Sequence, residues 1–547
     1  MKKLSFLLLP AAFLLFSCGG KQQADMLVFN ATIYTVDSAF TTAEAMVIKD
    51  GKILETGRKE DLEKKYTAAT QTDAGGKFIY PGLIDAHAHF VGYGTGLLTV
   101  NLTGTESWDD IIHHVSDFAK DLPKDQWIIG RGWDQNDWPD KEFPSNEKLN
   151  ELFPDQPVLL TRIDGHAAIV NQKALEIAGV KPGDKLVGGE VEVKNGKLTG
   201  ILVDNAVDLV SAKIPSATPA QFISAMQQAE KNCFAVGLTT IDDCGLNYAV
   251  AEKIKMLQDT GLLKMRLYIM LSDEKSNFDY LDKKGIIKTD RFHIRSFKVY
   301  GDGALGSRGA CLLQPYSDKP GHYGFLLSDP QHFDSVANWI AQRNFQMCTH
   351  AIGDSGNRTI LNIYNKYLNG KNDRRWRIEH AQVINAADFN LFGSASIVPS
   401  VQPTHATSDM YWAGKRLGAE RVKGAYAYKQ LLEQNGWLPL GTDFPVEDIS
   451  PFKTFYAAVI RKDAKGWPEN GFQTENALSR EQALRGMTIW AARSNFEEKE
   501  KGSLEPGKFA DFIILDRDLM KATENELLQT QVLETFLGGE SVFKKKF

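Results

Sequence analysis

Two histidines separated by a single residue, His87 and His89, follow the apolar pair Leu83-Ile84. In a β-strand, residues two apart project from the same face, so both imidazoles can point at one ion. Imidazole nitrogen is a common ligand of zinc and similar metals. The pair is weak evidence by itself, because solvated or core histidines explain most such pairs. It indicates a metal centre only if further ligands lie nearby.

Three more candidate ligands, His350, His380 and Asp443, each stand at the end of a short apolar run. Lys298 lies near the end of a similar run, where an unpaired ammonium group would be costly to bury. It therefore needs an acidic partner, a path to solvent or a modification. Carboxylation by CO₂ would turn it into an anion able to bridge two cations.

These residues belong to a series of apolar runs that are mostly separated by helical patterns. Such a series predicts a (β/α)₈ TIM-type barrel, here over residues 81–494, whose active-site residues gather at the carboxyl ends of the strands. The gap between about residues 90 and 231, after the first strand, is too long for one connection and predicts an inserted subdomain. The eight strand candidates are residues 83–85, 239–241, 265–271, 296–300, 345–350, 377–380, 397–401 and 438–443.

Strand-like runs also occupy both ends of the chain, at residues 26–80 and 495–547. Asp50-Gly51 is a hairpin turn signal between two of these runs. Neither end is long enough for a sheet with its own core. Together they predict one small composite β-sandwich domain.

Residues 1–18 predict an export signal, because Lys2 and Lys3 precede an apolar stretch too short to span a bilayer. The stretch ends in Leu15-Phe16-Ser17-Cys18-Gly19, which resembles a bacterial lipobox and implies lipid attachment to Cys18. An ordinary signal peptide with an incidental cysteine is the alternative. We expect an exported bacterial lipoprotein, periplasmic or at the cell surface, anchored to a membrane through Cys18, with residues 19–25 as a tether.

Charge and cysteine usage narrow the functional class. A formal net charge of −6 over 547 residues argues against a nucleic-acid partner, which usually requires a basic surface. No pair of the remaining cysteines shows C-x-x-C spacing, so neither a zinc knuckle nor a redox motif is indicated. These cysteines are Cys233, Cys244, Cys311 and Cys348.

Six segments jointly resemble the amidohydrolase superfamily, in particular its amidohydrolase-3 branch of YtcJ-like and N-substituted formamide deformylase-like proteins. They are residues 81–89 (PGLIDAHAH), 298–308 (KVYGDGALGSR), 349–354 (THAIGD), 377–382 (RIEHAQ), 441–446 (GTDFPV) and 502–511 (GSLEPGKFAD). The resemblance covers nearly the whole mature chain and implies a metal-dependent hydrolase.

The resemblance also implies roles for the candidate ligands in a centre for one or two divalent metals, expected to be zinc. One histidine pair would bind each ion, a carboxylated lysine would bridge them and an aspartate would touch the metal: His87 with His89, His350 with His380, Lys298 and Asp443. Asp443 would also act as the catalytic acid and base for the attacking water. Whether one ion or two bind stays open, because members of the superfamily differ.

Candidate substrate contacts are Trp133, Asp134, His166, Arg308, Gln402 and His405. His166 could donate to a carbonyl or developing oxyanion as a second catalytic residue, or it is a solvated or structural histidine. Arg308 could bind a carboxylate as a bidentate fork, or it anchors its loop through a salt bridge. Trp133 would suit an apolar substrate, although buried tryptophans more often serve packing.

We therefore expect a metal-dependent amidohydrolase that cuts a C–N bond of a small amide, formamide or cyclic amide. Ester hydrolysis or deamination on the same metal site is an alternative within enzymes. A surface lipoprotein that binds metal or ligand without turnover is an alternative of another class. The expected partners are the small-molecule substrate and the membrane, and a homodimer is compatible with the sequence. Residue patterns do not identify the substrate.

Overall fold

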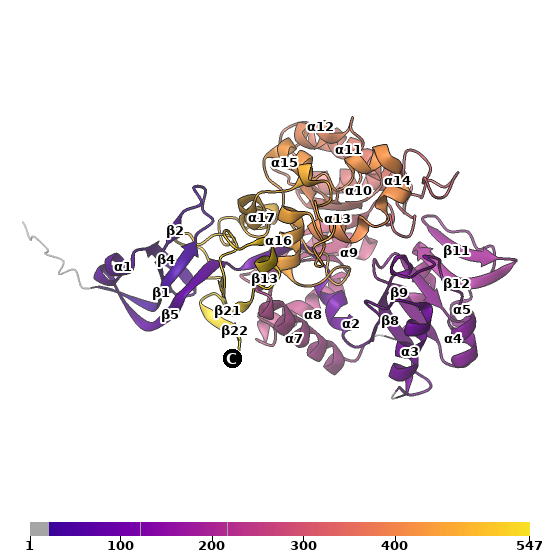
Figure 1. Cartoon of the computed structure of the whole chain (residues 1–547), viewed down its shortest axis with the longest axis horizontal. Coiled ribbons are helices and arrows are strands. Elements are labelled where there is room, and N and C mark those ends of the chain that lie inside the picture. Colours follow the sequence, from indigo (N-terminus) through magenta and orange to yellow (C-terminus); the bar gives the residue numbers. More distant parts are fainter. Residues whose placement is uncertain (1–20, 121, 216, 547) are drawn as a thin grey trace, which may run out of the picture.

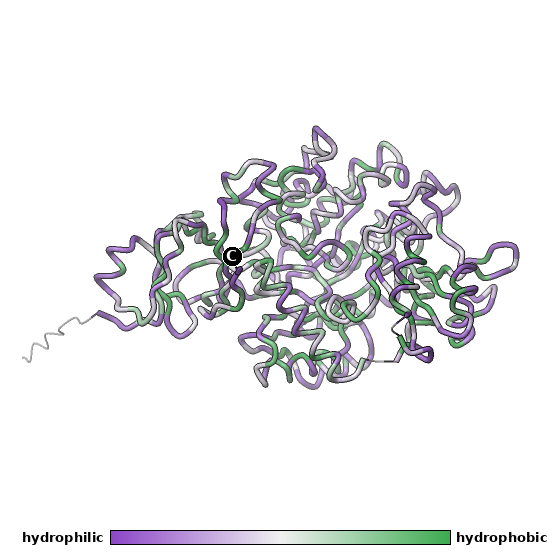
Figure 2. The backbone as a smooth tube through the Cα atoms, turned by 60° about the horizontal axis from the view of Figure 1, so that its bottom comes forward, coloured by the Kyte–Doolittle hydropathy of each residue, from purple (hydrophilic) through white to green (hydrophobic). Residues whose placement is uncertain are grey.

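The computed structural model describes residues 21–120, 122–215 and 217–546. The predicted export signal and Cys18 lie outside these residues. Three β-sheets organise the described chain, from the composite sheet on the left of Figure 1, through the barrel, to the insertion on the right. Outer loops are mostly hydrophilic (Figure 2). Within the described residues, no helix is both long and apolar enough to cross a membrane.

The composite sheet joins strands from both chain ends in the order β22-β21-β20-β5-β1-β3-β4, with β2 beside β1. Asp50 and Gly51, both at positive φ, form the predicted turn between β3 and β4. All the strands belong to one hydrogen-bonded sheet. The elements are β1 (Gln22–Tyr34), β2 (Thr42–Ala43), β3 (Ala45–Lys49), β4 (Lys52–Gly57), α1 (Lys59–Lys65), β5 (Tyr66–Pro81), β20 (Phe512–Leu515), α19 (Glu524–Leu527), β21 (Val532–Leu537) and β22 (Glu540–Lys544).

The tether predicted for residues 19–25 is wrong from Gln22 onward, because β1 begins there. Gln22 and Gln23 pair in parallel with Tyr66 and Thr67 at the start of β5. This stretch is polar and carries no strand pattern of its own. The neighbouring strand supplies the backbone hydrogen bonds that hold it extended.

Seven parallel strands form the barrel wall in the order β6-β13-β14-β16-β17-β18-β19, with β15 (Ile287–Lys288) beside β16. The eighth candidate, residues 438–443, is not a regular strand, since Pro439 has no N–H to donate. It still fills the gap between the first and last strands: the Gly441 N–H donates to Val401 O, and Leu440 O accepts from Ala86 N. The fold is therefore the expected (β/α)₈ barrel. Its strands are β6 (Leu83–Ala88), β13 (Leu238–Leu246), β14 (Arg266–Ser272), β16 (Phe292–Tyr300), β17 (Gln346–Ala351), β18 (Arg377–His380) and β19 (Val398–Ser400).

Helices cover the outside of the barrel, and their ends follow ordinary capping rules. Pro219 and Pro330 each open a helix, behind the capping side chains of Thr218 and Asp329. The helices are α2 (Phe90–Gly96), α7 (Pro219–Ala235), α8 (Tyr248–Asp259), α9 (Lys275–Lys284), α10 (Pro330–Arg343), α11 (Asp354–Leu368), α12 (Phe389–Ser394), α13 (Pro403–Asp409), α14 (Ala413–Arg421), α15 (Tyr428–Asn435), α16 (Pro451–Ile460), α17 (Arg480–Gly486) and α18 (Ile489–Ser494), with short 3₁₀ turns η2 (Val422–Gly424) and η3 (Thr474–Asn476).

The insertion after β6 folds around a six-stranded sheet of order β11-β12-β10-β9-β8-β7. Its predicted range of about 90–231 is too wide, because Phe90 of α2 and Met226 of α7 pack in the main barrel cluster. The insertion's elements are β7 (Val100–Asn101), α3 (Trp108–Ala119), β8 (Ile128–Trp133), η1 (Gln135–Asp137), α4 (Glu147–Leu152), β9 (Val158–Arg162), β10 (Ala167–Val170), α5 (Gln172–Ala178), β11 (Gly189–Lys194), β12 (Lys197–Asp204) and α6 (Asn205–Ser211).

Candidate metal centre

The candidate metal ligands meet where the carboxyl ends of the barrel strands face the insertion. They lie in or directly after β6, in β16, β17 and β18, and in the segment that closes the barrel: His87, His89, Lys298, His350, His380 and Asp443. All except the fully buried His87 line a cavity of about 730 Å³. The opposite wall belongs to the insertion and includes Arg131, Asp134 and His166. The structure thus brings all six candidates to one place.

Asp443 lies between two groups of imidazoles. Its Oδ1 is 3.3 Å from Nε2 of His89 and 3.7 Å from Nε2 of His87. Donor atoms around a tetrahedral zinc ion lie roughly 3.4 Å apart when the metal–ligand bonds are about 2.1 Å. The spacing of this first group therefore suits a single shared ion.

The second group combines Asp443 with His380 and His405, and their ligand atoms lie within 4.8 Å of one another. His350 does not belong to either group, but its ring lies 4.6 Å from the ring of His380. Three buried atoms here have no hydrogen-bond partner within the described residues: His350 Nε2, His380 Nδ1 and Asp443 Oδ1. Unsatisfied buried ligand atoms are what a cation site requires, so these residues fit a metal.

Asp85 fixes the backbone that carries Asp443. Its carboxylate accepts from the Thr442 N–H at 2.9 Å, from the Thr442 hydroxyl at 2.6 Å and from the His87 N–H at 3.2 Å. Asp443 itself has φ 66°, a strained conformation for a residue with a side chain. The contacts of Asp85 hold that conformation and join both sides of the closing seam.

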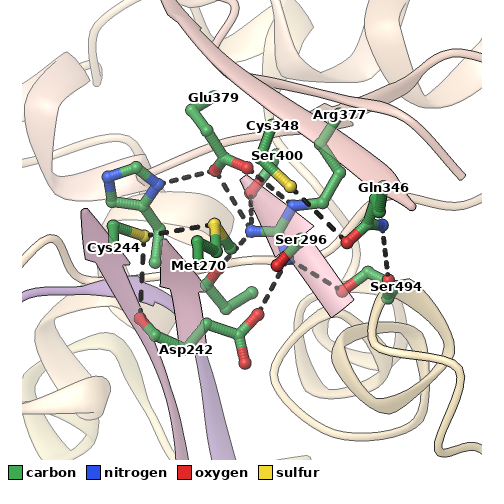
Figure 3. A network of polar contacts seen from close by, with 12 residues as sticks. Asp242, Cys244, Met270, Ser296, Gln346, Cys348, Arg377, Glu379, Ser400 and Ser494 are labelled. Carbon is green, nitrogen blue, oxygen red and sulfur yellow. Dashed lines mark hydrogen bonds and ion pairs between the residues drawn. The ribbon is translucent and has the colours of Figure 1, made fainter. Parts of the chain in front are cut away.

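Beneath the site, Asp242, Arg377 and Glu379 form a buried chain of charges (Figure 3). Nδ1 of His87 lies 2.6 Å from Oε2 of Glu379, and Arg377 bonds both Glu379 and Asp242. Burial alone would raise the pKa of Glu379, but Arg377 and His87 lower it to about 2. Burial and the nearby Lys298 lower the pKa of His87 to about 4. The neutral imidazole thus donates through Nδ1 and directs the Nε2 lone pair to the centre.

Sequence reasoning gave Glu379, Arg377 and Asp242 no role. A signal was present, because Arg377 and Glu379 alternate along a short strand that has to be buried in a barrel. Charged side chains in such a place are stable only when paired.

Lys298 is almost fully buried, and its Nζ lies 3.2 Å from Nε2 of His87. The structure records no salt bridge for it to any described carboxylate. The ring centroid of Tyr300 lies 5.2 Å from Nζ. The ammonium group therefore points into the space among the metal ligands.

The insertion contributes a histidine–aspartate pair to the cavity. Nδ1 of His166 lies 2.6 Å from Oδ1 of Asp204, and the imidazole ring centroid lies 5.0 Å from that of His350. Burial would lower the pKa of His166, but Asp204 raises it above its usual value. His166 is therefore a hydrogen-bond donor that faces the metal ligands.

Glycines in the 298–308 segment explain how the insertion comes so close. A Cβ at Gly303 or Gly309 would lie 2.5 or 2.3 Å from Oδ2 of Asp204. A Cβ at Gly306 would lie 3.2 Å from the guanidinium nitrogens of Arg162. The small residues after β16 therefore leave room for polar side chains of the insertion.

Comparison with known proteins is consistent with this arrangement. The model of the amidohydrolase family (Amidohydro_3) matches residues 71–543, which include the barrel, the insertion and part of the composite sheet. The chain belongs to the amidohydrolase family.

Several relatives match this amidohydrolase over almost their full length. Protein LONG AFTER FAR-RED 3 of Arabidopsis thaliana is 34% identical and covers 95% of this chain and 92% of its own. The putative amidohydrolase YtcJ of Bacillus subtilis is 30% identical over 94% of this chain and 98% of its own. N-substituted formamide deformylase of Arthrobacter pascens is 24% identical over 95% of this chain and 98% of its own.

A solved structure of an uncharacterised metal-dependent hydrolase from Pyrococcus horikoshii superimposes with a TM-score of 0.75 at 27% identity, covering 91% of this chain and 99% of that one. The family and this neighbour identify the protein as a metal-dependent hydrolase. The candidate ligand set supports a divalent metal.

Three predicted substrate contacts do not reach the cavity of this amidohydrolase. Trp133 is fully buried in the core of the insertion, where its indole N–H donates to Leu160 O. Arg308 pairs with Asp318, which anchors its loop. Gln402 is buried, and its amide donates to Ser400 O. For Trp133 packing and for Arg308 a local salt bridge, the alternatives stated above, explain the residue.

The other predicted contacts, Asp134, His166 and His405, do line the cavity. Nε2 of His405 lies 3.1 Å from Oδ2 of Asp443, and its Nδ1 lies 3.0 Å from Oε1 of Glu447. Burial would lower the pKa of His405, but these two carboxylates raise it well above its usual value. His405 therefore holds Asp443 directly.

Proposed function

We propose that this amidohydrolase cuts a C–N bond in a small amide, formamide or cyclic amide. The observation that carries the proposal is the position of Asp443, whose two oxygens face different histidine groups and the cavity. A relative is called N-substituted formamide deformylase, which supports this bond class. We further propose that the metal is zinc, held by His87 and His89, with His350 and His380 for a second ion.

A bound divalent metal supplies a water of lowered pKa and polarises the scissile carbonyl. The protein's own residues handle the proton and the developing charge. Asp443 accepts the proton of the attacking water and passes it to the leaving nitrogen. His166, oriented by Asp204, which also raises its pKa, donates to the carbonyl oxygen as negative charge develops there. His405 keeps Asp443 oriented throughout.

Lys298 is proposed to carry a carboxylate on Nζ. Its burial among three histidines, without a salt bridge to a described acid, leaves a positive charge where cations are expected. Carboxylation exchanges that charge for an anion and removes the conflict.

The proposed activity is tested with purified protein, metal analysis and a panel of N-formyl and N-acyl amines. The panel includes the corresponding esters and an aminopurine, which detect ester hydrolysis and deamination. Amide turnover that is lost in Asp443→Asn supports the proposal. Full metal occupancy without Asp443-dependent turnover of any compound would instead indicate a non-catalytic binding protein.

We also propose that the protein is an exported, membrane-anchored lipoprotein, on the basis of the sequence around Cys18. In the native host, Cys18→Ala should move the protein from the membrane to the soluble fraction. Unchanged membrane association would refute the anchor.

A further inference from the structure

The cavity contains four cationic side chains besides histidine, and three of them are already accounted for. Arg162 forms ion pairs with Asp134 and Asp164. Lys453 pairs with Asp448 at 2.6 Å, and Lys298 belongs to the metal centre. Arg131 lines the same cavity, and no ion pair is recorded for it anywhere in residues 21–120, 122–215 and 217–546.

Arg131 is nevertheless held firmly in place. It lies near the end of β8, and its Nη2 donates to Ile163 O at 2.9 Å. Gly165 leaves room for the guanidinium, because a Cβ there would lie 3.5 Å from both terminal nitrogens. The Nε atom is buried and has no hydrogen-bond partner in the described chain. The protein thus holds the Arg131 guanidinium in place without pairing it with an acid of the described chain.

The charge of Asp443 in the candidate metal centre also acts on Arg131. Burial lowers its pKa, while the charges of Asp164 and Asp443 raise it. Since Asp164 is already engaged by Arg162, neither acid neutralises Arg131 by contact. The guanidinium thus shares the cavity with Asp443.

We propose that Arg131 is a specificity residue that binds a carboxylate of the substrate, so that the preferred substrates are N-acyl or N-formyl amino acids. This rests on the proposed C–N hydrolysis. A guanidinium binds a planar carboxylate through two parallel N–H donors.

The first test compares substrates that differ only in the acid. N-acylglycine, N-acyl-β-alanine and N-acyl-4-aminobutyrate are each assayed beside their neutral primary amides, because the chain length sets the reach from the metal centre to Arg131. In the wild type, one acid should be preferred over its amide. Arg131→Gln should raise KM for that acid about 10- to 100-fold, as expected for a lost charge-assisted pair. KM for the corresponding amide should stay unchanged. An equal rise in KM for the acid and the amide, or no rise for the acid, would overturn the proposal.

A second test does not depend on turnover. Binding of 4-phenylbutyrate and of neutral 4-phenylbutanol to the metal-loaded protein is measured by calorimetry. The acid should bind more tightly, and Arg131→Gln should abolish the difference. Arg343→Gln, on the outer face of α10 with Asp282 as its partner, is the matched control and should behave as wild type. Binding of the acid that is unaffected by Arg131→Gln would mean that the carboxylate sits on the metal alone and would refute the subsite. Arg131-dependent binding without hydrolysis of any panel compound would refute only the proposed activity.

Discussion

Asp204, at the end of the insertion's last strand, lies 2.6 Å from His166 and orients its imidazole toward the metal ligands of the barrel. The insertion thereby supplies a positioned hydrogen-bond donor to the site. Asp204 can occupy this place only because Gly303 and Gly309 leave space for it.

Asp204→Asn should therefore lower kcat about 100-fold, as for loss of an oriented donor, with little change in KM and none in metal content. Steady-state kinetics and metal analysis measure both. Asp184→Asn, in an exposed turn of the same insertion, is the control. A decrease in bound metal would instead mean that Asp204 only supports the fold.

Glu379→Gln should weaken metal binding about 10- to 100-fold, because the amide no longer fixes the tautomer of His87. Competition with a chelating dye measures the affinity. Asp242→Asn removes a partner of Arg377 but none of His87, so it should leave metal affinity close to wild type. Equal effects of the two variants would contradict a specific role for Glu379.

Lys298→Ala should abolish activity, and short carboxylates such as acetate or propionate should restore part of it by replacing the proposed bridging anion. Rates at increasing carboxylate concentration test this. Chloride at equal ionic strength provides the comparison. Rescue by both anions alike would speak against a bridge.

His350→Ala should lower the metal content, because the unpartnered Nε2 of His350 faces the centre. Elemental analysis of the purified variant gives the stoichiometry. His332→Ala, which affects a histidine paired with Asp273 away from the cavity, should retain the wild-type content. Unchanged stoichiometry in His350→Ala would remove it from the ligand set.

Glu497 gives a prediction on acid stability. It is buried beside His293 and Lys501, and although burial raises its pKa, Lys501 and His293 lower it from 4.5 to about 2. A depressed carboxyl pKa stabilises the fold above the unfolded value and loses this contribution as the pH falls from 4.5 to 2. Glu497→Gln should cost about 3–5 kcal/mol at pH 7.

Urea unfolding at pH 7, 4.5 and 3 measures this effect. The variant should lose less stability than the wild type between pH 4.5 and 3. Parallel pH dependence of the two proteins would contradict the assignment.

The sequence allowed the strand-end residues to be predicted, because β-strand alternation and barrel topology suffice to bring His87, His350 and His380 together. It did not allow the residues that hold the candidate metal ligands in position to be predicted. Glu379 acts through a contact across the barrel, and nothing near it in the chain indicates His87. Two interpretations stayed open for Trp133 and Arg308, because proximity in a motif does not tell whether a side chain faces the cavity or the core.

The composite sheet can form completely only when nearly the whole chain has been synthesised. β5 pairs with β20, so the first strands made must wait for almost the last ones to leave the ribosome. Until then one backbone edge of β5 has no partner and is open to wrong pairing with other chains. For a protein exported before folding, this delay is harmless, since the chain folds only when both ends are present. If the same chain stayed in the compartment where it is synthesised, it would depend on chaperones to protect that edge.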